Sequence, residues 1–249
     1  MLYAAMTFWI LVTVLTAWGV HRLWSGMVKP SVLNALLLPG TLIALLGHIL
    51  GLLITGATVK TATLYKDDES GDPETTINPR PRIPIIGPLV IGLLPLLACG
   101  TAIYFAARYL GGAIMAHMST PVVGPKLPTT LTGVFQMLRD HISLVESIVA
   151  ATRAADFHHW KTGLFVYLLI CLTVRMAPFV GTLRGAIGAI VVLGIGAGMI
   201  ASLFDVADPR VQTGWSILNL TVAALSFLLL VSLLIRGGVG LFRLLSNNA

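Results

Sequence analysis

The chain has 249 residues, of which 56% are hydrophobic and only 10% are charged, and its formal net charge is +6. Soluble globular domains carry about 25% charged residues, so this composition excludes an ordinary water-soluble domain. The mean hydropathy of +0.90 and several apolar runs long enough to cross a bilayer indicate an integral membrane protein. The positive charge is expected to face anionic lipid rather than nucleic acid, because no nucleic-acid-binding motif accompanies it.

The apolar runs predict one all-α multi-pass membrane domain that covers residues 1–249. The first run has no basic segment ahead of it and no small-residue cleavage site, so it predicts a retained span rather than a cleaved signal peptide. Six spans fit the hydropathy, near residues 3–24, 32–57, 84–108, 162–180, 185–204 and 213–235.

Residues 59–65, "VKTATLY", partly alternate apolar with polar positions and contain β-forming residues, which predicts a short strand at the membrane surface. The stretch 66–84 is rich in acids and prolines and predicts a solvated loop. Pro88 and Pro95 lie in or near the third span and predict a kink or a break there.

Residues 112–160 form the longest polar region, a loop followed by an amphipathic helix over 131–157. This helix is expected to rest on the membrane surface or to pack over the bundle, and a partner-binding face is the alternative. Its apolar stripe contains Val134, Phe135, Leu138, Ile142, Val145, Ile148 and Val149.

The fifth span is rich in glycine, with Gly185, Gly188, Gly194 and Gly198 at spacings that let helices approach closely. Packing within the same bundle is the favoured use of these glycines, and dimerisation is the alternative. The two cysteines, Cys99 and Cys171, both lie in apolar runs and are expected to be small core residues.

A single histidine, His48, lies in the second span. A zinc-peptidase helix carries two histidines four residues apart, with a glutamate next to the first. When this template is placed on the second span, the second histidine falls on His48, the first falls on Ala44 and the glutamate falls on Leu45. The stretch resembles the membrane-embedded zinc metallopeptidases of the site-2-protease class. The residues that keep the frame of that family's motif are Pro39, Gly40, Gly47, His48, Gly56, Ala57 and Val59.

The resemblance extends over residues 30–205. In that family a short surface strand and a proline-broken span follow the motif helix, and residues 59–65 and 83–100 are similar to them. Residues 166–188 resemble the segment that supplies the third metal ligand. There Pro178 is kept, whereas the aspartate position is occupied by Thr182.

These departures predict a pseudoprotease, because only His48 remains of the three ligands that the resemblance implies. A hydrolytic zinc site keeps about three protein ligands and a bound water, so no catalytic residue, metal or other cofactor is expected here. His48 is expected to be a hydrogen-bonded structural side chain, with Thr41, Thr55 or Thr182 as partner. A still-active protease would need distant ligands such as His141, His158 or Asp205.

Two functions remain open. The favoured one is a non-catalytic membrane protein that binds a membrane partner, as a complex subunit or with a second copy of itself, through the former substrate groove. The alternative is a transport or permeation protein with a polar site at His48, Arg175 and Thr182. Arg175 by itself is expected to snorkel to the membrane surface.

The resemblance implies a bacterial cytoplasmic membrane as the location. Six spans place both termini on the side of the 60–83 loop, and Lys and Arg residues close to span ends favour the cytoplasm for that side.

Overall fold

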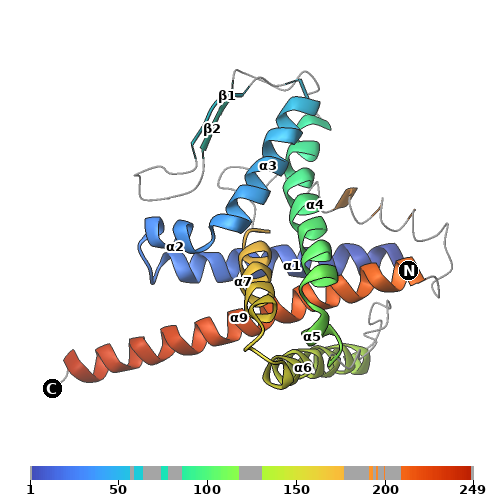
Figure 1. Ribbon diagram of the computed structural model, residues 1–249. Coiled ribbons are helices and arrows are strands. Elements are labelled where there is room, and N and C mark those ends of the chain that lie inside the picture. The colour runs from blue at the N-terminus through green and yellow to red at the C-terminus, as the bar shows by residue number, and fades with distance from the viewer. Residues whose placement is uncertain are drawn as a thin grey trace.

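The computed structural model describes residues 2–56, 59–63, 74–77, 86–117, 131–176 and 209–247, and the single residues 191, 192, 195 and 199. These parts of the chain are mostly helical (Figure 1). The helices are α1 (Leu2–Ser25), α2 (Pro30–Leu36), α3 (Leu38–Ile54), α4 (Ile86–Tyr109), α5 (Gly112–Met115), α6 (Leu131–Ala154), α7 (Trp160–Val174) and α9 (Pro209–Asn247).

Two short strands, β1 (Val59–Thr63) and β2 (Glu74–Ile77), pair antiparallel, with Thr63 opposite Glu74. Gly56, at a φ of 76°, turns the chain out of α3 just before β1, as a left-handed residue commonly does at a helix end. The strand β1 therefore lies inside the segment 59–65 where a strand was predicted. The loop predicted over 66–84 is wrong in one respect, because it contains β2. A position at a membrane surface stays a prediction.

Two helix pairs cross each other. Helices α1 and α9 lie side by side, and they run across the pair made by α3 and α4 (Figure 1). The shorter helix α7 contacts all four of these helices and so joins the two pairs. The described helices therefore do not form one parallel bundle of the kind that six successive spans suggest.

Proline acts differently in the second and third predicted spans. The span predicted over 32–57 is divided at Leu37 into α2 and α3, and Pro39, which lacks an N–H group, lies in the first turn of α3. Helix α4, by contrast, continues through Pro95, so of the kink or break predicted there the break is absent and the kink stays a prediction.

Among the described residues, two helices are long and apolar enough to cross a membrane, with candidate spans at Val90–Tyr109 and Ile217–Val239. In the first of these spans only 22% of the most apolar stretch is buried, and in the second 44%. The core helix of a soluble protein, by contrast, is mostly buried. Helices α3 and α7 are apolar but shorter, and the span predicted over 185–204 lies largely outside the described residues. The count of six spans therefore stays a prediction.

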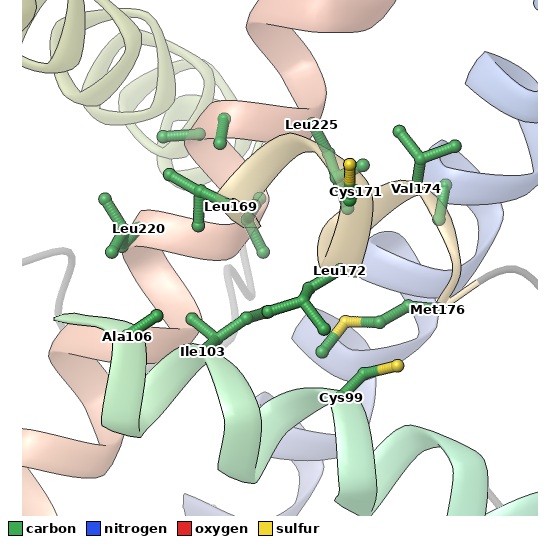
Figure 2. Packing of buried hydrophobic residues seen from close by; sticks show 14 of the residues in the cluster. Cys99, Ile103, Ala106, Leu169, Cys171, Leu172, Val174, Met176, Leu220 and Leu225 are labelled. Carbon is green, nitrogen blue, oxygen red and sulfur yellow. The ribbon is translucent and has the colours of Figure 1, made fainter. Parts of the chain in front are cut away.

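The core forms where α7 meets α4 and α9 (Figure 2). Leu172 of α7 points toward Ile103 of α4, and Met176 lies beside Cys99. Cys99 and Cys171 are both buried free thiols in this cluster, which confirms their predicted role as small core residues.

Helix α6 packs against α9 and α5, so of the two placements expected for it the packed one is observed. Among the described side chains of this helix, Leu144, Ile148 and Ala151 are buried. Phe135 and Ile142 of the predicted stripe are 71% and 59% exposed, so these two residues of the stripe are not covered by the packing of α6 against α9 and α5.

Candidate functional site

The three residues compared with the zinc-peptidase motif, Ala44, Leu45 and His48, share the buried face of α3. Ala44, Leu45 and His48 are all buried there, and the spacing of four residues between Ala44 and His48 stacks them on successive turns. Among the described residues, no three His, Cys, Asp or Glu side chains come close enough to hold a metal ion. At this site α3 offers one imidazole, and the two motif positions before it carry apolar side chains.

Two glycines bring this face of α3 into backbone contact with α4. A methyl group added at Gly47 would lie 2.7 Å from the carbonyl oxygen of Leu94 and 2.8 Å from Cα of Pro95. One added at Gly51 would lie 2.9 Å from Cα of Ile91. At these two positions the backbones of α3 and α4 therefore touch, and the former substrate groove stays a prediction.

A third glycine brings α3 against α7. A methyl group at Gly40 would lie 2.1 Å from the carbonyl oxygen of Cys171, closer than any real Cβ approaches an oxygen. Beside this contact the Leu36 carbonyl accepts hydrogen bonds from the Tyr167 hydroxyl at 2.8 Å and from the Cys171 thiol at 3.3 Å. The end of α2 and the start of α3 are thus held on α7 by both packing and hydrogen bonds.

Arg175 follows the last residue of α7 and is only 3% exposed. Its Nη2 donates a hydrogen bond to Oδ1 of Asn34, which is buried on α2. The prediction that Arg175 snorkels is therefore wrong, because the guanidinium is buried between α2 and α7.

Of the proposed polar site, His48 comes from α3 and Arg175 from the end of α7, while Thr182 lies outside the described residues. The hydroxyls of Thr41 and Thr55, suggested as partners of His48, donate to carbonyls of their own helical turns. Pro178 also lies outside the described residues, and so do Gly185, Gly188, Gly194 and Gly198.

A polar contact between α6 and α9 is also one that the sequence did not indicate. His141 of α6 hydrogen-bonds through Nε2 to the hydroxyl of Ser226 on α9 at 2.7 Å, and its ring stacks on Trp9 of α1. The other two residues named as distant ligands are His158 and Asp205. His158 is exposed, with its Nδ1 3.3 Å from Oδ1 of Asp156, and Asp205 is outside the described residues. No sequence motif joins positions 9, 141 and 226, since the three come from different helices.

The spacing of two of the contact glycines is a sequence signal for close helix packing. Gly47 and Gly51 have the small-xxx-small spacing that also marks Gly194 and Gly198 in the predicted fifth span.

Comparison of the chain with models of protein families, with curated proteins and with solved structures finds no match.

Proposed function

We propose that this chain is a non-catalytic multi-pass membrane protein, built on a scaffold like that of the site-2 proteases, and that it binds another membrane protein. The observation that carries the proposal is the buried face of α3, which packs against α4 and α7. Ala44 and Leu45 occupy the positions where the resemblance implies a ligand and a general base, and both side chains are buried. Neither side chain is able to bind a metal ion or accept a proton.

Membrane insertion is supported by the apolar side chains that the helices leave uncovered. On α3 they include Leu42, Leu46, Leu50 and Leu53, which repeat along the side of the helix turned away from the glycine contacts. Large runs of exposed apolar surface on a folded protein mark contact with lipid or with a partner. The count of six spans, the bacterial cytoplasmic membrane and the cytoplasmic termini also belong to this proposal and rest on the sequence.

We propose the exposed α3 leucines, rather than a groove at Gly47, as the partner-binding surface. Helix α3 is only 17 residues long and carries the motif region, and its other side is already occupied by α4 and α7. A partner helix would therefore approach Leu46 and Leu50, where no described residue covers the side chains.

Photo-crosslinking in native membranes tests the partner proposal. A photoreactive residue is placed at Leu46 of α3 or, as matched control, at Leu234 of α9, which is 68% exposed. We expect one discrete protein adduct from position 46 and none of the same mass from position 234. Adducts only with lipid, or the same adducts from both positions, would contradict partner binding at α3.

Metal analysis tests the absence of catalysis. The intact chain and a His48→Ala variant are purified in mild detergent with zinc present, and bound zinc is measured after dialysis. We expect far less than one zinc per chain in both samples. About one zinc per chain that is lost in His48→Ala would mean that other ligands join His48, and the non-catalytic proposal would be abandoned.

The transport alternative is less well supported. It needs His48, Arg175 and Thr182 around one water-filled path, whereas Arg175 is buried against Asn34 between α2 and α7. Cysteines placed at positions 34 and 48 that react with aqueous thiol reagents in intact membranes would favour transport over the scaffold proposal.

A further inference from the structure

A histidine connects α6 to the rest of the molecule. His141 stacks on Trp9 with ring centroids 5.6 Å apart and an angle of 27° between the planes, and its Nε2 is 2.7 Å from the Ser226 hydroxyl. One side chain of α6 thus contacts both α1 and α9. The other contacts of α6 with its neighbours are made mainly by small and aliphatic residues such as Leu144 and Ala151.

The other ring nitrogen of His141, Nδ1, determines how protonation changes the hydrogen bonding of this site. Nδ1 of His141 is buried and has no hydrogen-bond partner among the described residues. A neutral imidazole has one N–H group, whereas the protonated ring has two and accepts nothing. Whichever tautomer the neutral ring adopts, the site offers one polar partner, Ser226, so the protonated ring would bury an N–H group without an acceptor.

The surroundings do not supply a compensating negative charge. Burial lowers the pKa of His141, and no charged group among the described residues contributes to the shift. Stacking on Trp9 favours the imidazolium cation of His141, but it offsets only part of the lowering of the pKa by burial. The charged or titratable residues on the elements around the site, besides His141 itself, are Arg139, Asp140, Glu146 and Arg153 of α6, His117 after α5, Tyr3, His21 and Arg22 of α1, and Arg210, Arg236 and Arg243 of α9.

We propose that His141 is a pH-sensitive latch that holds α6 against α1 and α9 while its ring is neutral and releases the helix when the ring is protonated. This is a regulatory property that does not depend on the proposed function. Three large apolar residues of α6, Leu131, Phe135 and Ile142, are already exposed in the docked helix. Release would add Leu144 and Ile148 to the surface that α6 presents to lipid.

The direction of the pH effect follows from linkage. The pKa of His141 is lower in the docked state than in the free helix, so the free helix binds the proton more readily. Docking is therefore strongest above the ordinary histidine pKa of about 6.5 and weakens as the pH falls through that value. Below the docked pKa the weakening levels off, because both states are then protonated.

Hydrogen–deuterium exchange of the full chain in detergent measures this release. Exchange rates in α6 are compared at about pH 7.5 and about pH 5 and corrected for the intrinsic pH dependence of amide exchange. We expect the protection of α6 to fall about threefold or more, while α3 and α4 keep theirs. In His141→Gln, which retains a hydrogen-bond donor for Ser226 but does not titrate, the loss is expected to disappear.

His117→Gln is the matched control, since His117 is exposed and hydrogen-bonds only to Ala113 of its own segment. It should behave like the unaltered chain. Protection of α6 that does not change with pH, or that falls equally in His141→Gln, would overturn the latch. If His141→Gln does not fold, the unaltered chain still decides the question, because a loss shared by α3 and α4 would indicate general loosening and refute the proposal.

Discussion

The two crossed helix pairs are held together in different ways. Where α3 meets α4 and α7, the backbones approach through Gly40, Gly47 and Gly51, and each glycine faces main-chain atoms of the partner helix. Where α1 meets α9, side chains make the contact: Gly19 faces only the end of Leu229, and the Trp24 indole donates to the Ser232 hydroxyl at 2.7 Å. Since side chains can rotate aside and backbones cannot, the first contact is expected to tolerate far less change than the second.

The largest effect is expected from Gly40→Ala, because the new methyl group would lie 2.1 Å from the Cys171 carbonyl oxygen. Helices α3 and α7 must then move apart, which we expect to lower the free energy of unfolding by about 3 kcal/mol or more. Thermal unfolding in detergent measures the change. A variant as stable as the unaltered chain would show that α3 and α7 do not touch at this point.

The buried polar contact of the same region comes next. In Asn34→Leu the guanidinium of Arg175 loses an acceptor inside the protein, which we expect to cost about 3 kcal/mol. Arg175→Met removes the charge and leaves only an amide oxygen unbonded, so a smaller loss of about 1–2 kcal/mol is expected. Denaturant titrations compare the two variants. If Arg175→Met were the more damaging, the charge would be stabilised by more than Asn34.

Gly47→Ala and Gly51→Ala test the contact between α3 and α4. Each added methyl group meets backbone at 2.7–2.9 Å, so we expect a loss of about 1–3 kcal/mol for each, with Gly47→Ala the more severe. The same unfolding assay applies. Gly19→Ala is the matched control in the other pair, since its methyl group would meet a flexible leucine end at 3.4 Å, and it should change stability by less than about 0.5 kcal/mol.

The smallest effect, with the opposite sign, is expected in the open part of α9. Gly237 and Gly238 lie inside the helix, and a methyl group at either position would meet nothing within 4 Å. Replacing either by alanine should raise stability by about 0.5–1 kcal/mol, because alanine loses less backbone entropy in a helix. Loss of stability or of self-association in Gly237→Ala would reveal a contact between copies of the chain at α9.

Hydropathy, helix periodicity and turn residues predicted most of the described local structure. The ends of α1, α4 and α7 lie within a few residues of the predicted spans, except that α7 ends at Val174 where its span was expected to reach 180. Helix α6 and strand β1 also lie in the expected segments. Strand β2 was missed because its polar residues, such as Glu74 and Thr75, form a strand only when paired with β1.

The chain by itself determined where helices form, and that apolar Ala44 and Leu45 precede His48 on α3. These properties depend on residue type and short-range spacing. Only the tertiary structure decided which glycines touch another backbone, that Arg175 bonds to Asn34 rather than reaching the membrane surface, and that His141 meets Trp9 and Ser226. Such contacts join residues up to 141 positions apart, and their partners depend on how the helices cross, which no local pattern encodes.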